Sequence, residues 1–303
     1  MVKPILPFCF PVACTLLMLS QNFASATENG QQRYPIGINT VLNGIMPEPG
    51  NTQFYNYSLY YSADKLADKN GNEALPKFSA DVVVDAMRVV HTWDVDAGPF
   101  QLASGLVVPL IYNKVELPFG RDSTSGVGDI VLHGLYLGYR NIDANFYSFL
   151  ALDFTLPTGR YSDERIANVG ANTYGFAPSL NATWFPNPKT ELSATVGYEI
   201  NSPNHDTNYH SGNIAFAEWI VGYSVLPNLQ LGVQGYALQQ VTDDTSSSVD
   251  IDDGYRGKAF AIGPQVRYNF TPNSGIAVKW QHEFGVRNRP EGDRLWVQFS
   301  FPL

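Results

Sequence analysis

Cysteine is almost absent from this chain of 303 residues. Its two cysteines, Cys9 and Cys14, lie in a segment near the N-terminus that we predict is removed on export. The rest of the chain has no thiol. This excludes a disulfide framework, a thiolate nucleophile and a metal site with cysteine ligands.

Charged residues are also scarce. They make up 16% of the sequence, compared with roughly 25% in a typical soluble domain. Lys and Arg number 19 against 28 Asp and Glu, so the charge balance argues against nucleic acid as a partner. The histidines are too scattered to propose a histidine-ligated metal; they are His91, His133, His205, His210 and His282. The acidic cluster in residues 243–253 does not follow the EF-hand spacing of a calcium site. We expect neither a specific metal site nor a cofactor.

A long hydrophobic run is missing as well. No stretch after Ala26 approaches about 18 consecutive apolar residues, which excludes a transmembrane helix there. Before that point, Lys3, the mostly apolar stretch 5–19 and the small residues Ala24-Ser25-Ala26 form the pattern of a cleaved secretory signal. A membrane anchor is the alternative, but the apolar stretch is short and interrupted by proline. We therefore predict a signal peptide over residues 1–26.

The sequence has, instead, hydrophobic alternation with a period of two, which is typical of β-strands. About twelve segments show it, and they cover residues 52–63, 80–94, 98–115, 127–140, 144–156, 174–185, 190–201, 214–225, 229–242, 257–270, 275–285 and 294–302. The links between them alternate in length. Long links such as LPFGRDSTSGV, PTGRYSDERIANVGANT and GVRNRPEGD follow short ones such as NID, PNPK and LPN.

Alternating long and short links put all the long loops at one end of a sheet of hairpins, which is typical of bacterial outer-membrane barrels. We therefore predict an all-β fold over residues 52–303. It is a transmembrane, antiparallel, up-and-down β-barrel of about 12 strands in the outer membrane of a Gram-negative bacterium. A soluble β-sandwich also alternates, but its loops need not alternate in length.

In such a barrel the polar face of each strand lines the lumen and the apolar face meets lipid. In strand 275–285, for example, Lys279 and Gln281 share one face and Val278 and Trp280 the other. Polar side chains on inward faces are candidates for a solute path, unless they only pair with one another and fill the interior. The candidates are Asp153, Glu218, Gln230, Gln234, Gln265, Arg267, Lys279, Gln281 and Glu283.

Two regions do not fit this simple pattern. In strand 80–94, Arg88 and His91 fall on opposite faces, which predicts a bulge or a different register. The segment 27–51 is too rich in Pro and Gly to be a strand. It is either a disordered periplasmic leader or a tail folded into the barrel mouth as a partial plug.

The last strand, RLWVQFSFPL (294–303), is amphipathic and would be an unprotected edge in water. In a closed barrel it would pair with the first strand, around residues 52–63. Leu295, Val297, Phe299 and Phe301 would then face lipid. Pro302 and Leu303 follow Phe301, whereas barrels of this kind usually end on the aromatic residue itself.

Several stretches resemble the phenol meta-pathway degradation family, which includes the sphingosine-induced outer-membrane proteins. They span nearly the whole mature chain and include GINTVLNGIMPEPG (37–50), YNYSLYYSADKLADKNGN (55–72), GVGDIVLHGLYLGY (126–139), LPTGRY (156–161), YGFAPSLNATW (174–184), QQVTDD (239–244), GPQVRYNF (263–270) and KWQHEFGVRNRPEGDRLWVQFSFPL (279–303). The resemblance implies a transporter or porin-like barrel for hydrophobic or aromatic compounds. It carries over no catalytic motif.

Our leading hypothesis is thus a channel, not an enzyme, for passive uptake of small hydrophobic or amphipathic compounds. Its partners would be outer-membrane lipids, lipopolysaccharide and the solute. One alternative is a lipid-modifying hydrolase, suggested by His210 and Ser211. Neighbouring residues of a strand face opposite ways, however, which argues against a catalytic pair. A structural or adhesive barrel is the other alternative. The sequence leaves open the solute, the oligomeric state and the role of the acidic loop 243–253.

Overall fold

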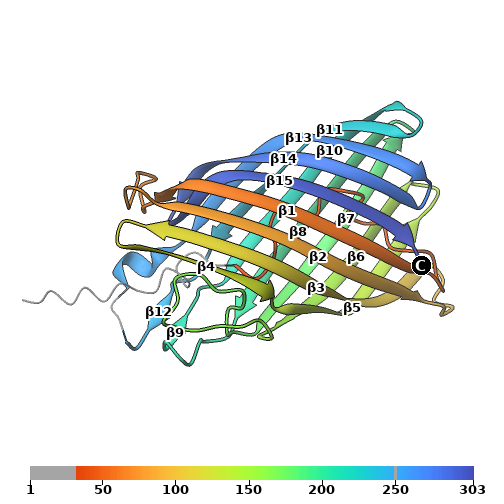
Figure 1. The fold of residues 1–303 in the computed structure, drawn as a ribbon. Helices are drawn as coiled ribbons and strands as arrows, with labels where there is room; N and C mark the ends of the chain where they lie inside the picture. Colours follow the sequence, from red (N-terminus) through yellow and green to blue (C-terminus); the bar gives the residue numbers. More distant parts are fainter. Residues whose placement is uncertain (1–31, 249–250) are drawn as a thin grey trace, which may run out of the picture.

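The structure is a computed structural model in which residues 32–248 and 251–303 are described (Figure 1). The predicted signal peptide, residues 1–26, lies outside the described residues. The strands in the described part of the chain are β1 (Thr52–Ala67), β2 (Ser79–Trp93), β3 (Phe100–Leu117), β4 (Gly120–Val127), β5 (Ile130–Asn141), β6 (Phe146–Leu156), β7 (Gly175–Asn187), β8 (Thr190–Asn201), β9 (Tyr209–His210), β10 (Ile214–Leu226), β11 (Leu229–Gln240), β12 (Thr245–Ser246), β13 (Lys258–Thr271), β14 (Ser274–Arg287) and β15 (Arg289–Pro302). A short 3₁₀ helix, η1, covers Asp252–Tyr255.

Thirteen of the described strands form one closed antiparallel sheet. Twelve of them make the barrel wall, and β4 is an extra strand that pairs with the outer part of β3. The short strands β9 and β12 form a separate two-stranded sheet. The predicted all-β barrel of about 12 strands is confirmed. Within the described residues, no helix is long and apolar enough to cross a bilayer.

The barrel closes where β1 pairs with β15. The register runs from Gln53 opposite Pro302 to Ala67 opposite Arg289, with one irregularity after Ala63. This pairing confirms the predicted seam between the first and last strands. It leaves no free edge in the barrel wall, as lipid requires, since the bilayer core offers no water to unpaired backbone groups.

Two of the predicted long loops are wrong. LPFGRDSTSGV contains β4, which forms a hairpin with β3. In GVRNRPEGD, β14 and β15 continue almost to each other and turn at Asn288, whose φ is +49°. Both stretches are polar, and they stand at the long-loop end of the barrel (Figure 1). A strand there needs no lipid-facing apolar face, so alternation did not reveal it.

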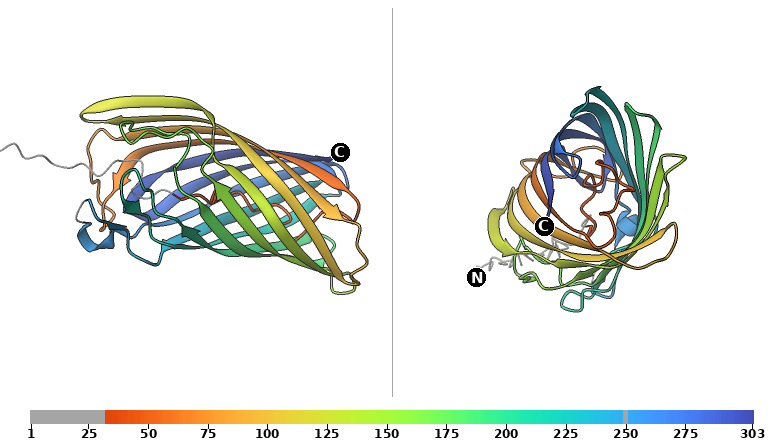
Figure 2. Two further views of the ribbon diagram at one scale, coloured as in Figure 1. Left: turned by 90° about the horizontal axis from the view of Figure 1, so that it is seen from below. Right: turned by 90° about the vertical axis from the view of Figure 1, so that its right-hand side faces the viewer.

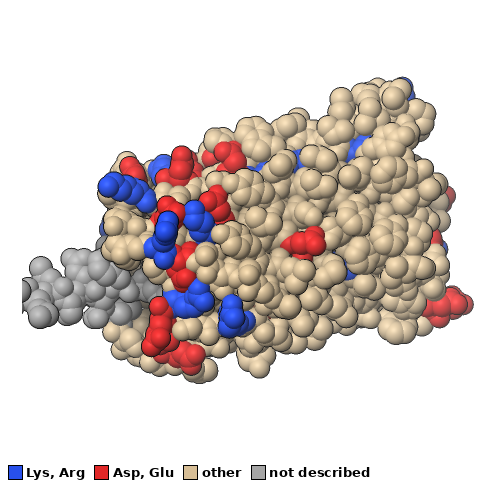
Figure 3. Space-filling model, viewed as in Figure 1, with Lys and Arg blue, Asp and Glu red and all other residues tan. Residues whose placement is uncertain are grey.

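The outer surface follows the prediction over most of the barrel. Large apolar side chains are exposed on it, among them Val196 at 60%, Leu231 at 46% and Val266 at 44%. On the face drawn in Figure 3, charged side chains gather mainly at the long-loop end and leave a largely uncharged belt over the middle of the strands. An apolar belt of this kind is typical of the lipid-facing surface of outer-membrane barrels.

Strands β1 and β2 depart from the expected polarity. Asn56, Ser58 and Asp85 face outward, and the Asp85 carboxylate accepts hydrogen bonds from the other two side chains at 2.7 and 3.0 Å. Their neighbours Leu59 and Val84 point into the barrel. In this part of the wall, the inward face is therefore apolar and the outward face carries polar groups that bind one another.

The predicted irregularity in strand 80–94 is wrong. Strand β2 pairs with both neighbours without interruption, so Arg88 faces the lumen and His91 faces outward. His91 Nδ1 lies 2.9 Å from Thr52 Oγ1, close to the short-turn end. The bulge lies in β5, where Gly134 is the extra residue between His133 and Leu135. Because of it, His133 and Tyr136, which are three residues apart, both point inward.

Candidate functional site: a cavity beside the N-terminal segment

The N-terminal segment, residues 32–50, runs inside the barrel from the long-loop end to the short-turn end. At its start, Gln32 Oε1 accepts a hydrogen bond from Arg289 at 2.8 Å. At its end, the backbone N–H of Gly50 donates to the carbonyl of Thr92 at 2.8 Å. Viewed along the barrel, this segment lies within the ring of strands (Figure 2, right).

Two buried carboxylates hold the first part of the segment. Glu218, on β10, accepts hydrogen bonds from the Tyr34 hydroxyl at 2.5 Å and the Gly37 backbone N–H at 2.6 Å. Glu199, on β8, accepts from the backbone N–H groups of Arg33 and Tyr34 at 2.9 and 2.6 Å. Both glutamates are 1% exposed. A carboxylate buried this deeply needs such donors, and the segment backbone supplies them.

Polar side chains of β13 and β14 hold the middle of the segment. Lys279 Nζ donates to the Ile38 carbonyl at 2.9 Å and to Thr40 Oγ1 at 2.6 Å. The amide of Gln265 donates to the Thr40 carbonyl at 2.9 Å and accepts from Thr40 Oγ1 at 2.8 Å. These residues face the lumen because of strand parity, as predicted from the sequence.

On the other side of the lumen lies a cavity of about 750 Å³. Its wall is formed mainly by inward side chains of β1, β2 and β3, and it is largely apolar because the inward faces of these strands are mostly apolar. The aliphatic and aromatic lining residues from these three strands include Leu59, Tyr61, Val82, Val84, Val107 and Ile111. The N-terminal segment borders this cavity through residues 32–35 and through Ile38 and Asn39.

A second cavity, of about 220 Å³, lies nearer the short-turn end, where Met46, Gln53 and Pro302 help to line it. The two cavities share six lining residues, which therefore surround the junction between them: Ile38, Asn39, Tyr57, Arg88, Tyr136 and Phe149. Together the cavities follow the lumen from one end of the barrel to the other. Any solute that passes from one to the other must pass these six side chains.

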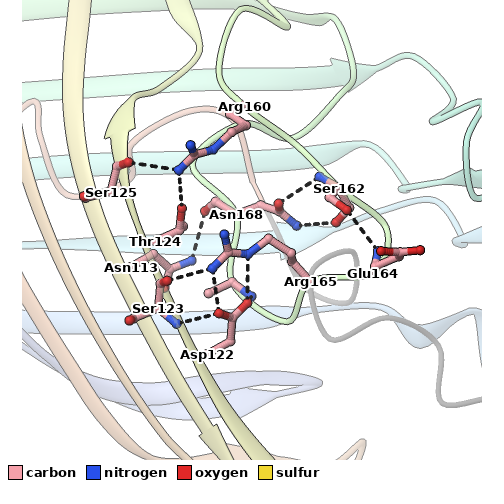
Figure 4. A network of polar contacts seen from close by, with 11 residues as sticks. Asn113, Asp122, Ser123, Thr124, Ser125, Arg160, Ser162, Glu164, Arg165 and Asn168 are labelled. Atoms are coloured by element: carbon pink, nitrogen blue, oxygen red, sulfur yellow. Dashed lines mark hydrogen bonds and ion pairs between the residues drawn. The ribbon is translucent and has the colours of Figure 1, made fainter.

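The loop 157–174 covers the outer end of the large cavity and is fastened to β4 (Figure 4). Arg165 binds the Asp122 carboxylate through two nitrogens at 2.6 and 3.1 Å, and the backbone N–H of Ala167 donates to the same carboxylate at 3.1 Å. Arg160 donates to Thr124 Oγ1 at 3.1 Å. The hydrogen bond from Arg165, together with those from backbone N–H groups, lowers the pKa of Asp122 to about 2. The carboxylate is therefore ionised at any physiological pH.

The structure places all nine candidate residues in the barrel interior. Two of them line a cavity: Asp153 the large one and Arg267 the small one. Several others bind the N-terminal segment, and the rest bind neighbouring lumen groups; examples are Gln230 with Glu191, Gln234 with Gln281, and Glu283 with Arg294. Most of the polar residues that parity identified therefore hold the segment or one another in place. Few face open space.

Sequence reasoning missed the polar group at the cavity junction. Arg88 donates to His133, Tyr57 and Tyr136, and the His133 ring binds Asp153 at 2.7 Å. Only Asp153 was identified in advance. The parity of Arg88 relative to His91 predicts an irregular strand and gives no sign of a polar group in the lumen. The bulge at Gly134 leaves no pattern in the sequence.

The two loop features noted in the sequence have local roles. The His210 ring binds the carbonyl of Asn201 at 2.8 Å, and no hydrogen bond joins it to Ser211 within the described residues. In the acidic loop, Asp244 accepts hydrogen bonds from the Gly212 backbone and the Gln240 side chain, each at 2.7 Å. Burial raises the pKa of Asp244, which lies outside the membrane-spanning strands.

Comparisons with known proteins agree with this architecture. The sequence model of the family described as "Putative MetA-pathway of phenol degradation" matches residues 63–299. An outer membrane channel from Pseudomonas putida F1 is similar, with a TM-score of 0.76 at 19% identity over 86% of this chain and 98% of that one. The β domain of the Bordetella autotransporter BrkA has a TM-score of 0.51 at 13% identity, over 83% of this chain and 99% of that one. No curated protein matches the sequence.

Proposed function

This chain belongs to the family described as "Putative MetA-pathway of phenol degradation", and from that membership we propose that it is a passive channel for small hydrophobic or amphipathic compounds. The observation that carries the proposal is the largely apolar cavity of about 750 Å³ beside the N-terminal segment. The similar protein from Pseudomonas putida F1 is itself described as an outer membrane channel. An apolar cavity inside a membrane barrel suits a solute that water accommodates poorly.

In this proposal the solute reaches the cavity at the long-loop end and moves along the wall formed by β1, β2 and β3. It then passes the junction at Arg88 and Tyr136 and leaves through the smaller cavity toward the periplasm. Binding along this path has to be modest, since a tight site would slow release. The movement needs no covalent step, and the protein acts as a channel and not as an enzyme.

The proposal gives the N-terminal segment the role of a fixed partial plug. Its hydrogen bonds with Glu199, Glu218 and Lys279 tie it to the polar side of the wall. It fills space that would otherwise hold water, so it would restrict hydrophilic solutes while leaving the apolar side free. Outer-membrane lipids and lipopolysaccharide would surround the uncharged belt.

Solute uptake into vesicles with lipopolysaccharide in the outer leaflet tests the channel. Such a leaflet resists apolar solutes, so uptake of labelled decanol should become faster when the protein is present. Uptake of labelled sucrose should change little, because the segment restricts hydrophilic passage. Equal decanol uptake with and without the protein would remove the proposal. Rapid uptake of both solutes would support a channel but contradict the role of the segment as a plug.

A further inference from the structure

Arg88 lies at the junction between the two cavities of the proposed path. Its side chain points inward from β2, opposite Tyr55 on β1 and Val107 on β3. It lines both the large and the small cavity, so it faces open space on two sides. A guanidinium group keeps its charge under all conditions of interest. The largely apolar path therefore contains a permanent positive charge at its junction.

The direct partners of this charge are all neutral. Arg88 Nη1 donates to the Tyr57 hydroxyl at 2.8 Å, Nη2 to the Tyr136 hydroxyl at 3.2 Å, and Nε to His133 Nε2 at 3.0 Å. A guanidinium has five N–H groups. Two of them thus donate to no residue in the described part of the chain, and a ligand in the cavity can use them.

His133 separates Arg88 from the nearest carboxylate. The Arg88 Nε atom can only donate, so His133 Nε2 must accept and the ring proton must lie on Nδ1. That proton is donated to Asp153 at 2.7 Å. His133 is consequently neutral, and it holds Asp153 one ring away from the guanidinium. Asp153 lines the same large cavity, but its hydrogen bond goes to the His133 ring, which it orients.

Other lumen arginines are paired differently. Arg267 lies 2.8 Å from a Glu191 oxygen, and Arg294 lies 3.1 Å from a Glu283 oxygen. Each therefore has its anion from the barrel wall itself. Arg88 has no such contact, although a buried charge is costly unless it is paired. Arg289, farther out in the large cavity, donates to the neutral Gln32 side chain. Arg88 is therefore the arginine at the junction where an anion from outside the chain would be stabilised.

Aromatic rings fix the guanidinium in place. Its central carbon lies 5.0 Å from the Tyr55 ring centroid and 5.8 Å from that of Tyr136, within the range of cation–π contact. The Tyr57 and Tyr136 hydroxyls accept from Arg88, so each can donate its own proton to the same ligand. An anion here would meet donors from three side chains that are already oriented.

We infer that Arg88, with Tyr57 and Tyr136, forms a binding site for the carboxylate of an amphipathic monoanion. The apolar body of this ligand would lie along the adjoining wall, where Val84 and Val107 line the large cavity. The inference rests on the proposed channel function and names its solute class: molecules with one carboxylate and an apolar body. Arg88 orients the solute by its charged end before it passes the junction.

Equilibrium binding to the full-length mature protein in bilayer nanodiscs tests the site. The probes are decanoate, decanol and decylamine at pH 7.4, which share one chain and differ in the charge of the head group. The intact protein should bind decanoate more tightly than the other two. Arg88→Gln should weaken decanoate binding by about tenfold to a hundredfold, the usual value of a charge-assisted hydrogen bond, and should leave decanol binding unchanged.

Two further variants locate the effect. The exposed Arg121, on β4, provides a matched control, and Arg121→Gln should leave the decanoate preference intact. Arg289 lines the outer part of the large cavity. If Arg289→Gln reduces decanoate binding as much as Arg88→Gln does, the preference comes from general charge and the assigned site is wrong. Tighter binding of decylamine than of decanoate would also overturn it, in favour of Asp153.

Vesicle uptake separates this inference from the proposed function. The protein could accelerate decanol uptake while Arg88→Gln changes decanoate and decanol uptake equally. That result would support the channel and contradict the carboxylate site. If the protein accelerates neither solute, the channel proposal itself fails. Arg88→Lys adds a control for folding, because it keeps the charge and should retain part of the decanoate preference.

Discussion

The two halves of the barrel interior differ in the polarity of their inward faces. From β7 to β14 the inward faces carry Glu, Lys and Gln side chains, and these bind the N-terminal segment. From β1 to β3 the inward faces are mainly apolar, and there the lumen stays open as a cavity. The same alternation of residues produces both halves. Strand parity therefore says which side chains point inward, but it does not say what chemistry the inward face has.

Backbone hydrogen bonding explains why residues 33–44 lie mainly against the polar half. The end of the segment reaches β2, where the Gly50 N–H donates to the Thr92 carbonyl. Residues 32–50 form no regular element, so their N–H and C=O groups need partners elsewhere. The polar half supplies them, for example through Glu218 and Lys279. The apolar half could not, and a segment placed there would leave buried backbone groups unpaired. The segment and the open cavity therefore divide the lumen between them.

The largest expected effect comes from removing the contents of the polar half. Deleting residues 27–46 should turn a filled lumen into a water-filled one and raise sucrose uptake into vesicles by roughly tenfold, as expected for a barrel of this width. Heat-dependent migration on a denaturing gel checks that the variant still forms a barrel. Unchanged sucrose uptake by a folded variant would show that the segment does not obstruct the lumen.

A single substitution tests the contact between the N-terminal segment and the barrel wall with a smaller structural change than the deletion. A Cβ atom at Gly44 would lie 2.3 Å from the Tyr147 carbonyl oxygen and 2.5 Å from the Thr183 backbone nitrogen. Gly44→Ala should therefore push the segment off the wall and increase sucrose uptake, though less than the deletion does. Gly120→Ala is the matched control, because its Cβ would meet only the end of the Ile166 side chain at 4.0 Å.

The third prediction concerns the apolar half. Ala86 points from β2 into the large cavity. It lies two residues before Arg88, on the same face of the strand. Ala86→Trp should fill part of the cavity and slow decanol uptake several-fold. Because the indole enters a cavity, the overpacking cost should stay at the low end of the usual range, about 1 kcal/mol of unfolding free energy.

Met87→Trp is the control for that experiment. Met87 is the next residue on the strand and faces outward, with 36% of its surface exposed. A tryptophan there should leave decanol uptake unchanged. If both variants slow decanol equally, the solute does not follow the apolar half of the lumen, and the distinction between the halves has no functional meaning.

The smallest effect is expected at the loop that covers the cavity. The pKa of Asp122 is lowered from 3.8 to about 2, so its ionised form favours the folded loop. That contribution is complete above about pH 4 and is lost as the pH falls toward 2. Hydrogen exchange of the loop 160–168, corrected for the intrinsic rate at each pH, should therefore show no change in protection between pH 7 and pH 5.

Asp122→Asn should speed that exchange at pH 7 by up to about fivefold, since a partly exposed ion pair contributes up to about 1 kcal/mol. Asp163→Asn is the control, because Asp163 is exposed and lies in the same loop. Faster exchange on going from pH 7 to pH 5 in the unaltered protein would mean that a group other than Asp122 fastens the loop.

Much of the fold could be predicted because lipid imposes a simple rule on a barrel wall. The alternation in strands such as β14 and β15 identified both their existence and their faces. The rule weakens where lipid is absent. Strand β4, with the sequence GRDSTSGV, stands at the long-loop end, and nothing there required an apolar face.

The site was harder to predict because its residues come together through contacts between distant strands. Parity placed Glu218 and Lys279 inside, but it gave no sign that residues 32–50 would cover them. The junction depends on Arg88 from β2 and on His133 and Tyr136 from β5, and the latter pair shares a face only because of the bulge at Gly134. A bulge is a property of the pairing between strands, which composition alone does not encode.

The seam between β1 and β15 bears on how this protein assembles. Neighbouring hairpins can form early because their strands are close in sequence, whereas these two strands come from opposite ends of the chain and pair only after a long loop closes. The segment 32–50 is joined directly to β1. It would therefore reach the interior together with the closing strand. The lumen carboxylates can remain in water until that moment, so the last step of folding seals the wall and buries its charges at once.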